Sequence, residues 1–472
     1  MMNLFQILRD SADSTPDRPY LYRRTAEPVS YSEAACKSAA LADCLRDSGQ
    51  FSQEPVLAAV VEDAEQVVSL IWACLAAGIC LAFLPKNRHP GQTRLLMCQT
   101  GADALVSDVK ELEALSLRLP ADMPEPARSA EPESAADSPA FLFQTSGTTG
   151  EAKWVKVAHG QFLRAIQGLD RAGGLAHAAE QTVYLTPPLA HSYGLSSLLE
   201  YTFAGSSIAL PGGGSPLGAV GDLRNPQLAR RLTAIEGVPF FYTQLAKLSG
   251  RIQLPGLRHI GTGGGAAVPT VFERLRRTYP VQTCSVRYGM TETPSVVSQK
   301  IFIGNHGEDW SSSGRVLPLY DLRIADEAGR HLAAGQVGEI HLQGDCLAMP
   351  YPGESDSGAD FFATGDLGYL DANQELHVVG RKSVYLKNRG FRVSPEYVEA
   401  AAVLHEEVHD CQALNDNGGL LLRVVPNDGA VSASDLLGFL AKRLPGYALP
   451  DQVQWVEEVA RTESGKIRRI YR

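Results

Sequence analysis

The sequence predicts an α/β protein with a large N-terminal region of packed sheets and helices and a small α+β C-terminal region. Strand-like and helix-like stretches alternate over the first part of the chain, as is typical of βαβ units and a parallel sheet. The last ~90 residues carry strand and helix signals of their own, GLLLRVVP and DLLGFLAKRL. The chain has 472 residues, more than one compact core usually holds, so more than one domain is expected.

The N-terminal elements follow from the pattern of apolar residues. Residues 31–48 and the segment PVLAAVVED predict a helix and a buried strand, and ADALVSD predicts a later strand. The run Val67–Leu84 is apolar apart from one serine and approaches the length of a membrane span. Gly78 divides it, however, into a helix with a glycine C′ cap and the short strand ICLAFLP. A buried helix and a parallel strand are therefore expected, and no membrane span.

Composition narrows the class of protein. The formal net charge is −10, which argues against a nucleic-acid partner because such proteins carry a basic face. Eight cysteines are scattered without a CxxC pair, which favours free thiols in a reducing compartment. The N-terminus lacks the apolar core of a secretory signal, so a cytoplasmic location is expected. Residues 119–139, rich in Pro, Ala, Ser and Glu, predict an exposed connection.

A glycine-rich segment after the strand FLF is the first candidate for chemistry. It reads Thr145-Ser146-Gly147-Thr148-Thr149-Gly150-Glu151-Ala152-Lys153. Small residues let backbone N–H groups approach phosphate oxygens, hydroxyls add donors, and a nearby lysine can reach the outer phosphates. The glycine spacing is not that of a Walker A loop, which weakens a P-loop kinase as an alternative. Taken alone, such a run is often a surface turn.

Four more motifs follow in order: Tyr288-Gly289-Met290-Thr291-Glu292, Thr364-Gly365-Asp366, Gly380-Arg381 and Ser464-Gly465-Lys466. With the glycine-rich segment, they resemble the signatures of the adenylate-forming superfamily, which includes acyl-CoA synthetases, aryl-acid and amino-acid adenylating domains and firefly luciferase. The resemblance extends over nearly the whole chain. It implies the adenylate-forming fold, with a large ATP- and acid-binding domain at 1–380 and a small mobile lid domain at 381–472.

The resemblance also implies an ATP site. Its residues are Thr145, Ser146, Gly147, Thr148, Thr149, Gly150, Lys153, Gly264, Gly265, Ala266, Tyr288, Gly289, Met290, Thr291, Asp366 and Arg381. Lys153 and the 145–150 loop should hold the β- and γ-phosphates, Thr291 should contact the α-phosphate, and Glu292 should hold Mg²⁺. With Lys466, the residues Lys153, Thr291 and Glu292 form the implied catalytic set. For the pair Thr291-Glu292, a helix N-cap with a first-turn acid is the alternative.

Roles for the nucleoside follow in the same way. Tyr288 should stack on adenine opposite the backbone of residues 263–266, where glycines permit close approach; a plain strand-end turn is the alternative. Asp366 should accept hydrogen bonds from the ribose hydroxyls, since a carboxylate suits a diol. Arg381 should help to hold the same ribose. As bare residues, Asp366 and Arg381 are more often surface charges.

Lys466 occupies the place of the superfamily's catalytic lysine, which bridges the carboxylate and the adenylate and stabilises developing charge. A flexible basic tail is the alternative. For the second half-reaction, the resemblance implies that the small domain rotates about a hinge at Ser383. The segment with Lys387, Gly390 and Arg392 then faces the active site and admits the thiol arm of CoA or of phosphopantetheine.

The segment PPLAHSYGLSS indicates the class of acid. Amino-acid-activating relatives usually carry an aspartate near this point, whereas this chain has His191, Ser192 and Tyr193, like acyl- and aryl-acid ligases. With Gly263 and Gly289, these residues should form the wall of a pocket for a neutral acyl or aryl group. A buried structural histidine is the alternative for His191.

The chain departs from the superfamily pattern at two places. Ala152-Lys153-Trp154 stands where Pro-Lys-Gly is usual, and Ser383 stands where the hinge is usually aspartate or lysine. The short C-terminal region suits a separate acyl carrier protein. The expected activity is ATP-dependent ligation of a carboxylic acid to a thiol. An adenylate-former with a non-thiol acceptor and a non-catalytic nucleotide- or acyl-adenylate-binding relative are the alternatives.

Overall fold

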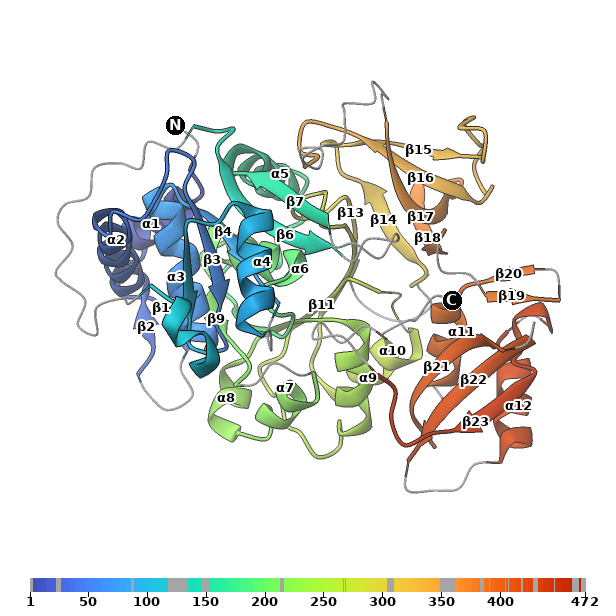
Figure 1. Cartoon of the computed structure of the whole chain (residues 1–472). Coiled ribbons are helices and arrows are strands. Elements are labelled where there is room, and N and C mark those ends of the chain that lie inside the picture. The colour runs from blue at the N-terminus through green and yellow to red at the C-terminus, as the bar shows by residue number, and fades with distance from the viewer. Residues whose placement is uncertain are drawn as a thin grey trace.

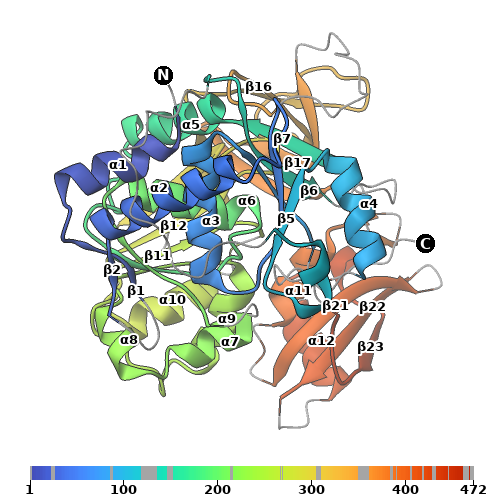
Figure 2. The same ribbon diagram turned by 60° about the vertical axis from the view of Figure 1, so that its left-hand side comes forward.

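The computed structural model of the chain describes residues 3–22, 27–85, 89–117, 135–145, 153–212, 216–265, 267, 269–303, 310–348, 361–382, 386–389, 391–403, 405, 407–416, 419–427, 432–444, 446–460 and 467. Within them lie a five-stranded sheet, a 13-stranded sheet and two small sheets near the C-terminus. Figures 1 and 2 show the long sheet running from the N-terminal helices to the strands β15–β18.

The five-stranded sheet carries the expected parallel strands. Its order is β5-β3-β4-β6-β7, with bounds β3 Val56–Val60, β4 Cys80–Phe83, β5 Ala104–Ser107, β6 Pro139–Thr145 and β7 Lys153–Ala158. Only β7 is antiparallel to its neighbour. Leu57 and Ala58, consecutive residues of β3, enter different apolar clusters. Both faces of the sheet are therefore covered, which explains the continuous apolar runs in the sequence.

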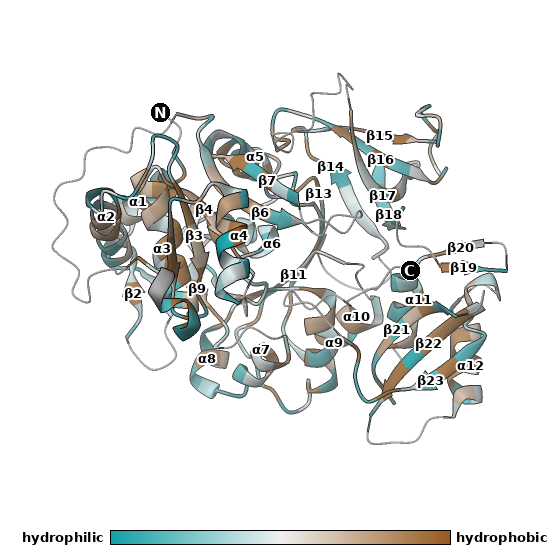
Figure 3. Cartoon of the chain, in the orientation of Figure 1, coloured by the Kyte–Doolittle hydropathy of each residue, from teal (hydrophilic) through white to brown (hydrophobic). Residues whose placement is uncertain are grey.

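Helices cover this sheet and one face of the long sheet. They are α1 (Phe5–Ser14), α2 (Tyr31–Asp47), α3 (Ala64–Ala77), α4 (Pro90–Thr100), α5 (His159–Arg171) and α6 (Ser192–Phe203). The prediction for the run Val67–Leu84 is confirmed: α3 ends at Gly78, whose φ of 73° is left-handed, and β4 follows. Figure 3 shows β3 and α3 coloured mainly as hydrophobic. Among the described residues, no helix is long and apolar enough to cross a membrane.

The long sheet positions the site. Its order is β15 (Asp321–Ala325), β16 (Gly338–Gln343), β17 (Phe362–Leu370), β18 (Glu375–Arg381), β14 (Ser312–Val316), β13 (Ser298–Ile303), β12 (Thr283–Tyr288), β11 (His259–Thr262), β10 (Ala234–Gly237), β8 (Thr182–Leu185), β9 (Ser207–Ala209), β1 (Pro19–Tyr22) and β2 (Val29–Ser30). The strands β8, β10, β11 and β12 are parallel. The other face of this parallel part is covered by α7 (Pro216–Asp222), α8 (Pro226–Arg231), α9 (Pro239–Lys247) and α10 (Pro269–Thr278).

The C-terminal elements have an apolar core of their own. The strands are β19 (Leu386–Asn388), β20 (Phe391–Val393), β21 (Val408–Asp416), β22 (Gly419–Pro426) and β23 (Gln452–Trp455), with helices α11 (Pro395–Ala402) and α12 (Ala433–Ala441). This core draws on residues from Leu386 onward. Lys247 of α9 contacts β21, where its ammonium donates to the carbonyls of Val408 and His409 at 2.8 and 2.7 Å. The boundary after residue 380 stays a prediction, and it falls one residue before the end of β18.

Candidate active site

Several of the predicted site residues lie together at one edge of the long sheet. The strands β8, β10, β11 and β12 run parallel, so their carboxyl ends meet at this edge. His191, Gly264 and Thr291 each follow one of these ends within a few residues of the strand. In open α/β sheets, ligands bind in the crevice outside the carboxyl ends of the strands.

A cleft with an empty volume of about 570 Å³, part of it open to solvent, lies at this edge. Five of the predicted residues line it: His191, Ser192, Tyr193, Gly264 and Thr291. Six lining residues were missed by the sequence analysis: Phe143, Gln144, Pro187, Pro188, Ala190 and Val238. The prolines stand in the same segment as His191, and Phe143 and Gln144 directly precede Thr145. Their adjacency to the two motifs is the signal that could have found them.

The start of α6 brings the expected acid-binding and phosphate-binding residues together. His191 is half-buried and occupies the N-cap position of α6, and its backbone N–H donates to the carbonyl of Pro188 at 3.0 Å. The hydroxyls of Ser192 and Thr291 lie 3.4 Å apart. The cleft is therefore closed on one side by the turn that follows β12. A fully buried position for His191, the alternative from sequence, is not found.

A second cluster lies between β12, β17 and β18. Asp366 stands opposite Arg381 in the antiparallel pair of β17 and β18. The Arg381 Nε–H donates to Asp366 Oδ1 at 2.8 Å, and the Tyr288 hydroxyl donates to Asp366 Oδ2 at 2.9 Å. Burial, together with the Asp366 carboxylate, raises the pKa of Tyr288 well above its usual value. The three residues form one hydrogen-bonded group, and Asp366 is buried within it rather than a loose surface charge.

The electrostatics of Arg381 link this group to Glu292. The Arg381 side chain is 47% exposed, and its partial desolvation works against the charged form. Asp366, Glu292 and Tyr288 nevertheless hold the pKa of Arg381 above its usual value. Glu292 is half-buried in the turn after β12, which is not a helix, so the helix N-cap alternative is wrong. One partly exposed carboxylate beside a cleft fits Mg²⁺, which takes one or two carboxylates and fills its shell with phosphate oxygens and water.

The turn itself depends on glycine. A Cβ at Gly289 would lie 2.8 Å from the carbonyl oxygen of Ser295, so a side chain there would push the turn open. Met290 follows, and its backbone N–H donates to the Thr293 hydroxyl at 3.0 Å. On the neighbouring strand, Gly264 has a left-handed φ of 73°. The backbone at Gly264 and Gly265 is exposed, which leaves room for a flat ring beside it. Ala266 lies outside the described residues.

Lys153 is the first residue of the five-stranded sheet after the glycine-rich segment. It begins β7 opposite Thr145, the last residue of β6, and it is half-buried. The predicted phosphate-binding residues between them, Ser146, Gly147, Thr148, Thr149 and Gly150, lie outside the described residues. Trp154 is 7% exposed and packs in an apolar cluster with Leu105 and Leu142. Its bulk is therefore accommodated in the core beside the sheet.

The residues predicted for the second half-reaction are only partly covered. Lys387 and Arg392 stand opposite each other on β19 and β20, so the expected thiol-facing segment is a two-stranded hairpin. Gly390 between these strands, the hinge residue Ser383 and the catalytic Lys466 lie outside the described residues. Their roles stay predictions.

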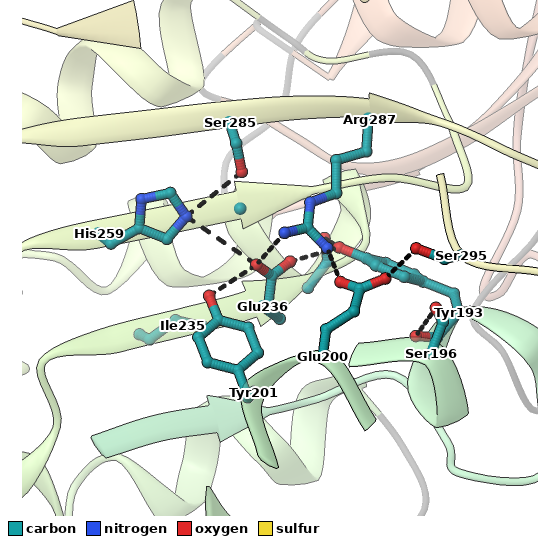
Figure 4. Close-up of polar contacts among 12 residues, drawn as sticks. Tyr193, Ser196, Glu200, Tyr201, Ile235, Glu236, His259, Ser285, Arg287 and Ser295 are labelled. Atoms are coloured by element: carbon teal, nitrogen blue, oxygen red, sulfur yellow. Dashed lines mark hydrogen bonds and ion pairs between the residues drawn. The ribbon is translucent and has the colours of Figure 1, made fainter. Parts of the chain in front are cut away.

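A buried ionic network lies behind the cleft, and none of the sequence motifs marks it. The Arg287 guanidinium donates to Glu200 Oε2 at 2.6 Å and lies 3.7 Å from Glu236 Oε1. Glu236 accepts from the hydroxyls of Tyr193 and Tyr201 at 2.8 and 2.9 Å (Figure 4). Among the described residues, two carboxylates here face one guanidinium. Burial raises the pKa of Glu200, although Arg287 acts in the opposite direction. Charged residues within apolar segments were the available signal.

Two histidines adjoin Glu236 and raise the question of a metal site. His177 and His259 together with Glu236 each offer a ligand atom within 4.8 Å of the others. However, the two imidazoles are stacked, with centroids 3.8 Å apart and planes at 25°, so they contact each other face to face. Both carboxylate oxygens of Glu236 already accept tyrosine protons. Burial lowers the pKa of His177 to about 3 and also lowers that of His259. Both imidazoles are therefore neutral and pack against each other.

Comparison with known proteins agrees with this geometry. The family model of the AMP-binding enzymes matches residues 8–352, and that of the AMP-binding enzyme C-terminal domain matches residues 397–466. The chain therefore belongs to the AMP-binding enzyme family, and the predicted membership in the adenylate-forming superfamily is confirmed.

Among curated relatives, a long-chain-fatty-acid–CoA ligase of Salmonella typhimurium is 28% identical over 354 residues, which cover 72% of this chain and 62% of the relative. An acyl-CoA ligase of Aspergillus oryzae is 30% identical over 365 residues, which cover 70% and 62%. The chain thus matches 62% of the length of each of these relatives.

Solved structures confirm the predicted fold class. An anthranilate CoA ligase in complex with anthranoyl-AMP superposes with a TM-score of 0.83 at 17% identity, over 98% of this chain and 95% of that one. The o-succinylbenzoate CoA synthetase of Bacillus subtilis, in complex with its acyl-adenylate intermediate, gives 0.80 at 24% identity, over 98% and 96%. The same synthetase is known with ATP and a magnesium ion.

Proposed function

We propose that the protein is an ATP-dependent acid–thiol ligase. It would activate an acyl or aryl carboxylic acid as acyl-AMP and pass the acyl group to the thiol of CoA or of a carrier-bound phosphopantetheine. The observation that carries this proposal is the meeting of two groups at one sheet edge: the cleft with His191 and Thr291, and the hydrogen-bonded group around Asp366. The absence of any disulfide among the eight cysteines supports a cytoplasmic location.

In the first half-reaction, a carboxylate oxygen of the acid attacks the α-phosphorus of ATP, and the bond to the pyrophosphate oxygen breaks. Both reactants are anions, so catalysis requires alignment and positive charge. Thr291 lines the cleft and is assigned to the α-phosphate. Lys153 at the start of β7 is assigned to the outer phosphates, and Lys466 to the charge that develops between acid and phosphate. These roles rest on the motifs and on the places of Thr291 and Lys153.

Two side chains would hold the rest of the nucleotide. Asp366 would accept hydrogen bonds from the ribose hydroxyls, and Arg381 orients this carboxylate through its 2.8 Å hydrogen bond. Tyr288 would present its ring to adenine across from the exposed backbone of Gly264. Glu292 would hold Mg²⁺, which when bound neutralises charge on the phosphate oxygens.

In the second half-reaction, the thiol sulfur attacks the acyl carbonyl carbon, the bond to AMP breaks, and AMP leaves with the electron pair. We assign the domains to 1–380 and 381–472, with a hinge at Ser383 that brings the hairpin of Lys387, Gly390 and Arg392 to the cleft. The relatives named as CoA ligases support CoA as acceptor. A separate carrier protein is the other thiol donor to test.

The experiment is a product analysis by mass spectrometry. The protein is incubated with ATP, Mg²⁺ and a carboxylic acid, with and without CoA or a phosphopantetheinylated carrier protein. The proposal predicts acyl-AMP without a thiol and an acyl thioester plus AMP with one. Acyl-AMP that persists with both thiols would indicate a non-thiol acceptor, and bound ATP without any acyl-AMP would indicate a non-catalytic protein.

A further inference from the structure

Tyr193 reaches from the acid cleft into the buried interior. Tyr193 is one of the residues that line the cleft, and its ring lies beside two glycines: a Cβ placed on the cleft-lining Gly264 would lie 4.0 Å from its Cδ1, and one on Gly263 would lie 3.4 Å from its Cζ. Its hydroxyl donates to Glu236 Oε2 at 2.8 Å, and Glu236 is completely buried (Figure 4). The ring therefore extends from beside the cleft-lining Gly264 to a far end that is fixed by a charge-assisted hydrogen bond.

The space behind Tyr193 is occupied by charge. Glu236 also accepts from the Tyr201 hydroxyl, and Arg287 lies beside it and binds Glu200. Figure 4 shows Tyr201 of α6 and Arg287 of β12 converging on Glu236, which belongs to β10. A Cβ on Gly261 would lie 2.3 Å from Glu236 Oε1, so the strand next to the carboxylate leaves no room for a methyl group.

These contacts bear on the length of acid that can bind. An alkyl chain that extended past Tyr193 would have to displace its ring and remove a donor from a buried carboxylate. It would then enter a region of two carboxylates and one guanidinium, where an alkyl chain cannot replace the hydrogen bonds lost. By contrast, Pro187, Ala190 and Val238 offer apolar surface to the cleft itself.

We propose that Tyr193, held in place by Glu236, closes the inner end of the acid pocket and restricts the enzyme to short-chain and single-ring carboxylic acids. Tyr193 is the specificity-determining residue, and Glu236 is a positioning residue that acts through it. The inference rests on the proposed function, because it names the acids that the proposed adenylation uses. It separates this chain from the long-chain-fatty-acid–CoA ligase of Salmonella typhimurium, 28% identical in sequence.

The test compares acids of different length on the same protein preparation. For each variant, kcat/KM for ATP–pyrophosphate exchange is measured with butanoate, benzoate and decanoate. The ratio of decanoate to butanoate does not depend on the fraction of folded enzyme, so a destabilised variant remains informative. In the unchanged protein, decanoate should be at least ~10-fold poorer than butanoate or benzoate. In Tyr193→Ala the ratio should rise ~10-fold or more, since the wall is removed.

Two variants separate the wall from the hydrogen bond behind it. Tyr193→Phe keeps the ring but frees its far end, so the ratio should rise less than in Tyr193→Ala. Tyr201→Phe is the matched control: it removes the other tyrosine donor to Glu236 without touching the cleft, and its ratio should match the unchanged protein.

Each outcome bears on a different statement. Exchange with decanoate as fast as with butanoate in the unchanged protein, or an unchanged ratio in Tyr193→Ala, would overturn the inference while leaving the proposed adenylation intact. No exchange with any acid would instead contradict the proposed function.

Discussion

Replacement of Arg287 by leucine tests the buried network most severely. Arg287 is 3% exposed and lies between two carboxylates that are fully buried, with Glu200 Oε2 at 2.6 Å and Glu236 Oε1 at 3.7 Å. Arg287→Leu keeps the apolar stem as far as Cδ but removes the guanidinium, which is the cation that faces both carboxylates among the described residues. Breaking a buried ion pair on one side costs about 3–5 kcal/mol, because the remaining charge stays desolvated.

The remaining contacts set the size of the effect within this range. Glu236 keeps its two tyrosine donors, and Glu200 keeps the Ser295 hydroxyl at 2.5 Å. Neither carboxylate is left without a hydrogen bond, so we expect a loss near the lower limit, about 3 kcal/mol. Glu200 can also take up a proton, since burial already raises its pKa and the loss of Arg287 would raise it further.

The assay is denaturant unfolding at pH 7.5 and at pH 5.5, followed by tryptophan fluorescence and by circular dichroism. A carboxyl whose pKa is raised in the folded state binds more protons there, so its contribution to stability increases as the pH falls. The destabilisation by Arg287→Leu should therefore be smaller at pH 5.5 than at pH 7.5. The variant Lys37→Met, which removes an exposed ion pair with Glu33, is the control and should cost under about 1 kcal/mol.

A loss below about 1 kcal/mol for Arg287→Leu would refute the reasoning, because it would place the guanidinium in water. A deficit that grew as the pH fell would also refute it. The double variant Arg287→Leu/Glu200→Leu should regain part of the loss, since replacing a buried pair by apolar groups is often neutral or stabilising.

Three further predictions concern other parts of the molecule. Asp366→Ala should raise the KM for ATP ~10- to 100-fold through lost ribose hydrogen bonds, and an unchanged KM would contradict that assignment. Lys466→Ala should lower acyl-AMP formation ~10²- to 10³-fold while affecting thioester formation from added acyl-AMP much less; equal losses in both half-reactions would exclude the role. Burial lowers the pKa of His159 to about 4, and its Nδ1 accepts the Leu4 N–H at 3.3 Å. This histidine therefore removes about 3 kcal/mol of stability as the pH falls from 6.5 to 4, and His159→Asn, with an oxygen acceptor, should show a shallower loss in acid unfolding.

Much of the fold could be read from local sequence signals. Gly78 marked the end of α3 because only glycine readily adopts the left-handed conformation of a C-cap. The apolar run of β3 indicated a strand buried on both faces, and the alternation with helices indicated a parallel sheet. These signals are short-range, so no knowledge of tertiary contacts was needed.

The candidate site could be predicted only where motifs mark it. The motifs predict that Asp366 and Arg381 bind the ribose. The direct hydrogen bond between them, however, follows from the register of β17 and β18, which cannot be read from the sequence. Glu200, Glu236 and Arg287 come from α6, β10 and β12, and no motif connects them. Such a network becomes visible only when the fold brings separated segments together.

We propose above that the cleft at the carboxyl edge of the long sheet adenylates a carboxylic acid. The measurement that tests it most directly is carboxylate-dependent ATP–pyrophosphate exchange over a panel of aryl, short-chain and medium-chain acids, with Asp366→Ala as the matched control. Exchange is expected with single-ring or short-chain acids, and weaker exchange is expected in the variant at limiting ATP. Bound ATP without exchange for any acid in the panel would contradict it.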